Sequence, residues 1–205
     1  MPDRRAGLLV DWGGVLTTDV FASFRAFCTA EGLEPETVRE RFREDAEARG
    51  LLACLETGEL LQAEFEPRFA ALLGVAPERL VERLFGATGP DEAMVGAVRA
   101  ARAAGVRTGL LSNSWRVEDY DRGVLEELFD AWVISGEEGI RKPDPAIYAL
   151  AARRMELPPD AIVYVDDLPG NLKPARALGM ATIAHRGDAD STLAELEPLL
   201  GLSLR

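Results

Sequence analysis

Five short apolar runs of strand length recur along the chain, with helical segments between them. The runs are rich in Val, Ile and Leu and lie at residues 7–10, 106–111, 131–135, 161–165 and 180–184. Buried parallel strands typically have continuous apolar sequences of this kind, joined by helices that cross the faces of the sheet. The pattern predicts an α/β fold built on a doubly wound parallel sheet of five main strands.

A long stretch without strand-like runs follows the first strand, from residue 19 to residue 87. Apolar residues recur there at helical spacing and predict four helices. Their apolar faces are Phe21, Phe24, Phe27 and Cys28; Val38, Phe42 and Ala46; Leu61, Phe65, Phe69, Leu72 and Leu73, ending at Gly74; and Leu80, Val81, Leu84 and Phe85, entered through Pro77. We predict a core domain of residues 1–17 and 91–205, with residues 18–90 as a helical cap over the carboxyl edge of the sheet.

Within the core, helices are predicted at residues 91–104, 117–128, 144–155 and 169–178. A last helix is predicted to begin at a Ser191 cap and to run through Leu200. Gly105 and Gly179 follow two of these segments, at the position where glycine commonly ends a helix.

The composition limits the class of partner. With 205 residues the chain has room for one α/β domain and a modest insertion. Its net charge of −12 argues against nucleic acid or a membrane as partner, but it leaves a small phosphorylated substrate open. The first residues do not resemble a signal peptide, and no apolar stretch reaches the roughly 20 residues that span a bilayer. We expect a cytoplasmic monomer or homodimer, with Cys28 and Cys54 reduced and buried.

Acidic or hydroxyl side chains follow three of the predicted strands. Asp11, Ser112 and the pair Asp166-Asp167 each stand where an apolar run ends. Ligands of such sheets bind outside the carboxyl ends of the strands, so these residues should converge on one pocket. Because crowded carboxylates do not all stay ionised without a cation, the site predicts Mg²⁺ and chemistry on an anionic oxygen substrate.

Each segment has a simpler structural explanation when it is taken alone. Asp11, before Gly13 and Gly14, can form a turn, and Ser112 can cap a helix. Lys142, one of only two Lys in the chain, stands before Pro143 and can be a solvated surface residue, although its charge also suits a phosphoryl group. The Asp166-Asp167 pair can be solvated at a strand end, but burial there would require a compensating cation.

Taken together and in this order, the four segments resemble the haloacid dehalogenase-like hydrolase superfamily over essentially the whole chain. The run from Asp166 to Arg176, followed by Leu178-Gly179-Met180, is similar to the N-terminal phosphatase domain of soluble epoxide hydrolases and its stand-alone bacterial relatives. The segment from Leu111 to Trp115 is similar to the same group. No epoxide hydrolase domain is expected to follow Arg205.

The resemblance implies a role for each motif residue. Asp11 would be the nucleophile that forms an aspartyl phosphate, and Ser112 and Asn113 would hold phosphoryl oxygens. Lys142 would pair with the nucleophile and with the phosphoryl group, and Asn171 would support the site and substrate binding. The implied Mg²⁺ ligands are Asp11, the backbone carbonyl of Gly13 and Asp167, with Asp166 assisting directly or through water. The cap would enclose the site and select the leaving group.

One position departs from the family pattern. Phosphatases of the superfamily usually carry a second Asp two residues after the nucleophile, as general acid for the leaving oxygen, and this chain has Gly13 there. General acid catalysis is typically worth about 10²–10⁴-fold in rate. The expectations are a slow phosphatase, a substitute acid from the cap, a good leaving group, or no catalysis.

The Gly at position 13 also leaves functions other than a phosphatase open. The alternatives are a non-catalytic binding or regulatory protein of this fold and, less favoured, a 2-haloacid dehalogenase, which needs neither the second Asp nor the Asp166-Asp167 pair. A phosphonate hydrolase would need a cap Lys, and residues 18–90 contain none. The one histidine, His185, is expected at the surface rather than as an acid.

Overall fold

The structure is a computed structural model that describes residues 4–115 and 120–204. Five strands form one parallel sheet in the order β3-β2-β1-β4-β5. They are β1 (Gly7–Val10), β2 (Arg107–Ser112), β3 (Ala131–Ile134), β4 (Ile162–Asp166) and β5 (Ala181–Ala184). The predicted doubly wound parallel sheet is confirmed, and each strand lies within one residue of its predicted bounds.

Strand β1 lies at the centre of the sheet, and its register positions the site. Val10, its last residue, pairs with Leu110 of β2 and with Val165 of β4. The carboxyl ends of parallel strands meet at one edge of a sheet. Asp11 therefore emerges between the ends of two neighbouring strands, level with Leu111 and Asp166.

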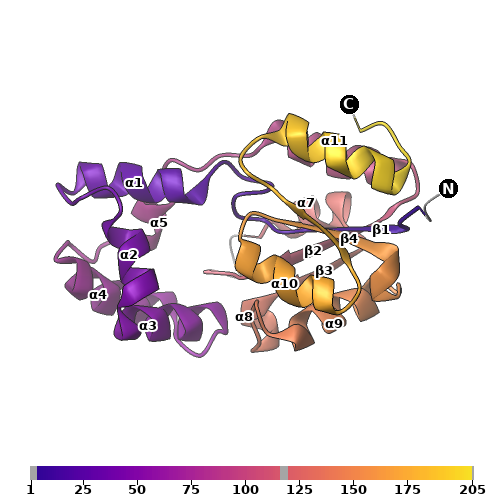
Figure 1. Ribbon diagram of the computed structural model, residues 1–205. Coiled ribbons are helices and arrows are strands. Elements are labelled where there is room, and N and C mark those ends of the chain that lie inside the picture. Colours follow the sequence, from indigo (N-terminus) through magenta and orange to yellow (C-terminus); the bar gives the residue numbers. More distant parts are fainter. Residues whose placement is uncertain (1–3, 116–119, 205) are drawn as a thin grey trace.

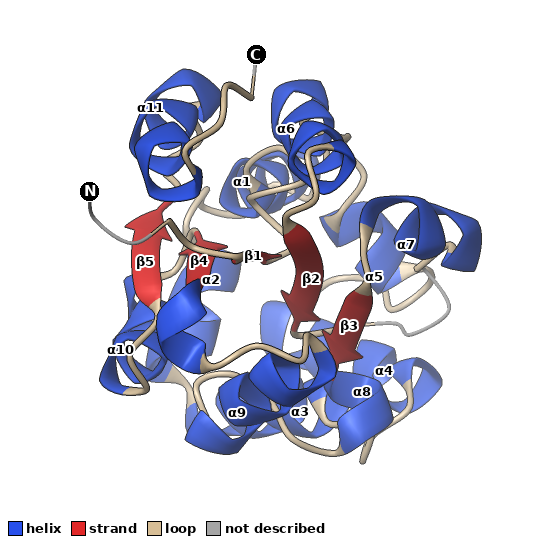
Figure 2. Ribbon diagram, turned by 90° about the vertical axis from the view of Figure 1, so that its right-hand side faces the viewer, coloured by secondary structure: helices blue, strands red, loops and turns tan. Residues whose placement is uncertain are grey.

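Helices cover both faces of the sheet (Figure 2). One face packs against α6 (Glu92–Ala103), α7 (Arg122–Leu128) and α11 (Ala189–Leu200), and the other against α9 (Pro145–Arg154) and α10 (Pro169–Ala177). Side chains alternate between the faces of a strand, so Leu8 and Val10 enter the first cluster and Leu9 the second. Two short segments, α8 (Ser135–Glu138) and η2 (Pro159–Ala161), complete this part.

The insert after β1 forms five helices that lie beside the sheet, at the left of Figure 1. They are α1 (Val20–Ala30), α2 (Thr37–Glu44), α3 (Ala46–Glu56), α4 (Gln62–Leu73) and α5 (Leu80–Leu84). They surround an apolar cluster of their own, which includes Phe24, Phe65, Phe69 and Leu80. The chain enters and leaves the insert through two adjacent segments, which are joined by a hydrogen bond of 2.8 Å from the Thr18 N–H to the Gly89 carbonyl. This pairing fits the domain boundaries that we propose, with residues 18–90 as the cap.

Trp115, in the loop after β2, joins the sheet to the insert. Its ring lies 5.0 to 5.9 Å, centroid to centroid, from the rings of Phe24, Phe42, Phe65 and Phe85. Edge-on and tilted aromatic contacts at such distances add about 0.5–1.5 kcal/mol per pair beyond area burial. A side chain from the loop that follows Ser112 thus packs into the core of the insert.

The second predicted helix of the insert is wrong, because the chain breaks at Asp45 and forms two helices, α2 and α3. The Asp45 backbone is extended, and its carboxylate accepts hydrogen bonds from the N–H groups of Glu47 and Ala48. An Asp that caps a new helix in this way competes with continuation of the old one. Ala46 therefore lies in α3, not on the same helix face as Val38 and Phe42.

Other helix ends also differ from prediction. Leu61 precedes α4 and is 68% exposed, so it is not a core residue. Pro77 lies in the turn before α5, whose first residue is Leu80. The last helix is capped by Asp188, to which the Ser191 hydroxyl donates, so the predicted Ser191 cap is wrong.

Helix α7 begins at Arg122 after the cap Asp121, and residues 117–119 of the predicted helix lie outside the described residues. Cys28 is buried and Cys54 only partly so, and both thiols are free. None of the helices in the described parts of the chain is long and apolar enough to cross a bilayer.

Candidate active site

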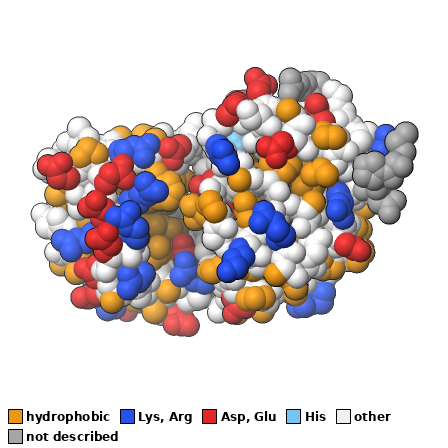
Figure 3. Space-filling view, in the orientation of Figure 1, with side chains coloured by type: hydrophobic (Ala, Val, Ile, Leu, Met, Phe, Trp, Pro, Cys, Tyr) orange, Lys and Arg blue, Asp and Glu red, His pale blue; other side chains and the backbone are white. Residues whose placement is uncertain are grey.

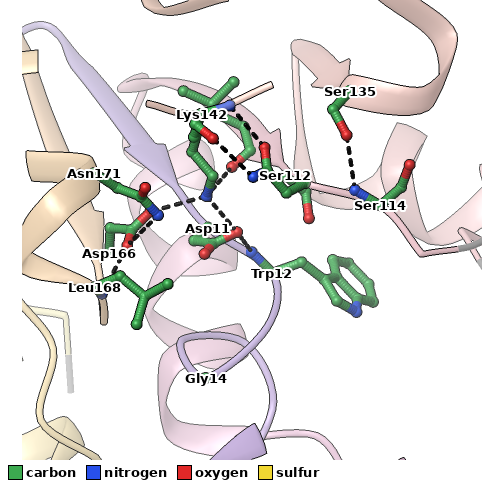
Figure 4. A network of polar contacts seen from close by, with 12 residues as sticks. Asp11, Trp12, Gly14, Ser112, Ser114, Ser135, Lys142, Asp166, Leu168 and Asn171 are labelled. Carbon is green, nitrogen blue, oxygen red and sulfur yellow. Dashed lines mark hydrogen bonds and ion pairs between the residues drawn. The ribbon is translucent and has the colours of Figure 1, made fainter. Parts of the chain in front are cut away.

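Asp11 lies at the floor of a cavity, directly after β1. Its backbone N–H donates to the Val165 carbonyl at 3.0 Å, which continues the sheet register by one residue. Its Oδ1 accepts from the Trp12 N–H at 2.7 Å and from Lys142 Nζ at 2.8 Å (Figure 4). The side chain is nearly buried but lines the cavity. A carboxylate held in this way presents its remaining lone pairs to a substrate.

Lys142 is the central cation of the site and is 1% exposed, so its interpretation as a surface lysine is wrong. Its Nζ lies 2.8 Å from Asp11 Oδ1 and 2.8 Å from Asp166 Oδ2, and it also donates to the Leu111 carbonyl at 3.0 Å. Burial lowers the pKa of Lys142, but the two carboxylates raise it further, so that the net pKa lies above its ordinary value. The ammonium group therefore stays charged beside Asp11.

Asp166 is fully buried and its carboxylate is saturated with hydrogen bonds. Besides Lys142 it accepts from the Leu168 N–H at 2.8 Å, from Asn171 Nδ2 at 3.0 and 3.1 Å, and from the Tyr164 hydroxyl. A carboxylate has about four lone-pair sites, and these donors occupy them. The contacts show Asp166 orienting Lys142 and Asn171, while Asp167 turns toward the cavity that it lines.

The donor set suits a hard divalent cation. One carboxylate oxygen each from Asp11, Asp166 and Asp167 lie within 4.8 Å of one another. Burial, and then repulsion from Asp166, raises the pKa of Asp167 to about 7. The pKa of Asp11 is also raised by burial and by both neighbouring carboxylates, against the opposing effect of Lys142. The candidate ligand atoms of this group are all carboxylate oxygens, which Mg²⁺ prefers.

Gly14 allows this approach of the acidic loops. Its φ is +71°, and a Cβ at this position would lie 2.6 Å from Asp167 Oδ2. Its N–H donates to Thr17 Oγ1 at 3.0 Å, which closes the turn after Asp11. Gly13 differs, because its backbone lies outside the left-handed region and an added Cβ would contact only Val20, at 3.4 Å.

Ser112 is the last residue of β2, and Asn113 follows it beside Lys142. The Ser112 hydroxyl shares a hydrogen bond of 2.8 Å with the Tyr120 hydroxyl. The Asn113 amide accepts from the Lys142 N–H at 2.8 Å and donates to the Lys142 carbonyl at 3.1 Å. The interpretation of Ser112 as a helix cap is wrong, since the next described helix starts at Arg122. The segment that ends β2 and the segment around Lys142 are therefore joined by hydrogen bonds at the cavity.

The cavity of about 390 Å³ lies between the sheet edge and the insert. The space-filling view shows a hollow there with hydrophobic side chains inside it (Figure 3). The sheet side supplies the polar groups described above, together with Arg141 and Tyr120. The insert side is mostly apolar: Val20, Phe21, Leu52, Phe85, Thr88 and Glu56. Such a division suits a ligand with one anionic end and one apolar end.

Several contributing residues were missed by sequence reasoning. Tyr164 contacts both Lys142, at 3.2 Å, and Asp166; it stands two residues before Asp166, and strand alternation could have placed both on one face. Glu56 and Tyr120 carry no motif signal. His185 is 2% exposed, so its predicted surface position is wrong. Its Nδ1 shares a hydrogen bond of 2.8 Å with Thr192, and it is not among the described residues that line the cavity.

A family model for haloacid dehalogenase-like hydrolases matches residues 6–179, which include every motif of the site. The chain belongs to this family. It is a hydrolase of the haloacid dehalogenase superfamily, and phosphatases are among its relatives. The resemblance inferred from the motifs is thereby confirmed.

Curated relatives and a solved structure extend the comparison. Bifunctional epoxide hydrolase 2 of Sus scrofa is 37% identical over 118 residues, 54% of this chain but 21% of that protein's length. Glyceraldehyde 3-phosphate phosphatase of Methanopyrus kandleri is 29% identical over 60% of this chain and 54% of its own length. A haloacid dehalogenase family enzyme of Bacteroides thetaiotaomicron, solved with magnesium and inorganic phosphate, has a TM-score of 0.67 at 23% identity, covering 88% of this chain and 93% of its own. At that identity the solved structure supports the fold.

Proposed function

We propose that the protein is a Mg²⁺-dependent phosphohydrolase that cleaves a small phosphate ester through an aspartyl phosphate on Asp11. The observation that carries the proposal is the arrangement around Asp11. Its carboxylate lies 2.8 Å from the buried Lys142 ammonium and within 4.8 Å of carboxylate oxygens of Asp166 and Asp167, in one cavity. This combination presents a nucleophile, a fixed positive charge and oxygen donors to one phosphoryl group.

Each residue of the cavity has a proposed role in cleavage of the phosphate ester. Asp11 attacks phosphorus, and the ester oxygen leaves toward the insert, because attacking and leaving oxygens lie roughly in line. The Ser112 hydroxyl and the Asn113 backbone N–H bind phosphoryl oxygens, and Lys142 balances their negative charge. Asn171 and Asp166 keep Lys142 in place through their mutual hydrogen bonds. Water then hydrolyses the aspartyl phosphate and restores Asp11.

Asp11, Asp167 and the Gly13 carbonyl are the groups that would hold Mg²⁺, with Asp166 assisting. When bound, the ion supplies neutralisation of phosphoryl charge. Saturation of Asp166 by protein donors favours an indirect role for that carboxylate. The Bacteroides relative, whose structure contains magnesium and phosphate, supports this assignment.

The substrate should carry an uncharged, at least partly apolar alcohol. Val20, Phe21, Leu52 and Phe85 form the wall opposite the phosphoryl site, and a cavity of about 390 Å³ admits a small ester. The phosphatase activity in the name of the Methanopyrus relative supports an ester substrate in general. That name does not make a triose the expected alcohol for this chain, because the insert wall of the cavity is mostly apolar and a sugar needs polar partners for its hydroxyl groups.

The proposed function is tested by phosphate release from a panel of aryl, alkyl and sugar phosphates, with Mg²⁺ and with EDTA. We expect turnover that requires Mg²⁺ and favours apolar esters over sugar phosphates. Including 2-chloropropionate in the panel tests the dehalogenase alternative. Release of chloride without release of phosphate would contradict the proposal.

Mg²⁺ is expected to raise the melting temperature. A cation that binds only the native state at ten times its Kd stabilises it by about 1.4 kcal/mol, or about 3–6 °C for a chain of this size. Melting curves in EDTA and in millimolar Mg²⁺ at constant ionic strength measure the difference. Asp167→Ala should remove the shift, whereas Asp160→Ala, an exposed Asp just before β4, should keep it. An unchanged wild-type midpoint would count against the metal site.

A further inference from the structure

Gly13 leaves the cavity without a carboxyl group where related phosphatases usually have their proton donor. An alkyl oxygen departs slowly unless it is protonated, and acid catalysis accelerates such steps by about 10²–10⁴-fold. A replacement donor has to reach the leaving oxygen from another wall of the same cavity. That oxygen points away from Asp11, and hence toward the insert.

Glu56 is the one ionisable side chain that the insert contributes to the described lining of this cavity. It is the last residue of α3, at the end of the helix that contacts α8 of the sheet domain. Its neighbours on the insert wall, such as Phe21, Leu52 and Phe85, carry no proton to donate. Position alone therefore singles out this carboxyl.

Three contacts with the sheet domain hold Glu56 in place. Its Oε2 accepts from Asn113 Nδ2 at 3.1 Å and pairs with Arg141 Nε at 2.5 Å. Its backbone carbonyl accepts from the Ser135 hydroxyl. The other carboxyl oxygen, Oε1, has no hydrogen-bond partner among the residues that the structure describes, and Glu56 is 6% exposed, at the cavity. One oxygen is thus anchored while the other remains free for a ligand.

Glu56 is also one hydrogen bond away from the phosphoryl site. Asn113 Nδ2 donates both to Glu56 Oε2 and to the Lys142 carbonyl. Both N–H bonds of the Asn113 side chain are thereby used, and the backbone N–H of Asn113 is the group proposed to hold a phosphoryl oxygen. A phosphoryl group between Asp11 and Asn113 would therefore direct its ester oxygen to the region of Glu56.

We propose that Glu56 is the proton donor for the leaving alcohol, supplied by the insert in place of an Asp at position 13. This inference rests on the proposed phosphohydrolase function. As Asp11 Oδ bonds to phosphorus, the phosphorus–ester oxygen bond breaks and the Glu56 proton moves to that oxygen, releasing the alcohol. The resulting Glu56 carboxylate takes a proton from the water that attacks the aspartyl phosphate, which regenerates both residues and releases phosphate.

The electrostatics agree with this role. Burial raises the pKa of Glu56, against the opposing charges of Arg141 and Lys142. A bound phosphoryl dianion beside Asn113 adds negative charge near the carboxyl and favours its protonated form. The ion pair with Arg141 keeps the carboxyl in position when it is ionised after proton transfer.

The test compares two esters in each variant: p-nitrophenyl phosphate, whose phenolate departs without a proton, and hexyl phosphate, whose alkoxide needs one. Glu56→Gln should lower kcat/KM for hexyl phosphate by about 10²-fold or more, and for the aryl ester by less than about tenfold. Adding Gly13→Asp to Glu56→Gln should recover most of the loss on hexyl phosphate. Glu59→Gln, an exposed residue in the turn after α3, should leave both values unchanged.

The ratio of the two kcat/KM values is measured within each sample, so partial unfolding lowers both values and leaves the ratio unchanged. If Glu56 had only a structural role, Glu56→Gln would also lower both kcat/KM values equally, and adding Gly13→Asp would not recover the activity on hexyl phosphate. Equal losses on the two esters, or no loss, would overturn the assignment of Glu56 while leaving Asp11 as nucleophile. A wild-type protein that cleaves neither ester with Mg²⁺ would instead overturn the proposed function and this inference with it.

Discussion

Asp11→Asn is expected to abolish phosphate release, with a loss of roughly 10⁴-fold or more in kcat, because the amide cannot form the aspartyl phosphate. The fold should survive, because Lys142 still has Asp166 at 2.8 Å as a charged partner. The amide oxygen of the new Asn can still accept a hydrogen bond from Lys142 Nζ. Removing one of three crowded carboxylates also relieves repulsion among them. Turnover of p-nitrophenyl phosphate and the melting temperature measure the two effects.

A matched control is Asp160→Asn, an exposed Asp at the amino-terminal end of β4, on the opposite edge of the sheet from the site. It should retain the wild-type rate. Turnover of Asp11→Asn at a rate near that of the wild type would show that another group is the nucleophile. A melting temperature of Asp11→Asn far below that of the wild type would show that Asp11 is needed for the stability of the fold.

The sheet and much of its active edge could be predicted from the sequence because both depend on local patterns. Buried parallel strands need apolar residues on both faces, so runs such as Val163 to Val165 mark them directly. The strand-end rule then places Asp11, Ser112 and Asp166 together without any knowledge of side-chain packing. The charge of Lys142 suggests a phosphoryl partner, but its burial follows from no local pattern, because it depends on acceptors at the ends of three separate strands.

Other features depend on tertiary contacts that no local pattern encodes. Glu56 ends an amphipathic helix, where a solvated carboxylate is the usual expectation, and only docking against Asn113 and Arg141 buries it. His185 is buried for a similar reason, through α11 and Thr192. The break between α2 and α3 had a local signal, the Asp45 cap, which helical periodicity on both sides of it obscured.

Gly13→Asp in the native chain is expected to speed alkyl esters more than aryl esters. The structure accommodates the change, since an added Cβ contacts only Val20 Cγ2, at 3.4 Å, and the backbone is not left-handed. The new carboxyl would stand two residues after Asp11, where a proton can reach the leaving oxygen. With Glu56 already donating, the gain on hexyl phosphate should be about tenfold, well below the 10²–10⁴-fold expected of an added acid catalyst.

The background in which the substitution is made decides how that gain is interpreted. In Glu56→Gln the same Gly13→Asp change should approach the full 10²–10⁴-fold, because no other donor then serves the alkyl oxygen. The two sites thus show strong non-additivity, as groups that share one step do. Values of kcat/KM for hexyl and p-nitrophenyl phosphate in the four proteins complete the cycle. Equal gains in both backgrounds would show that positions 13 and 56 act on different steps.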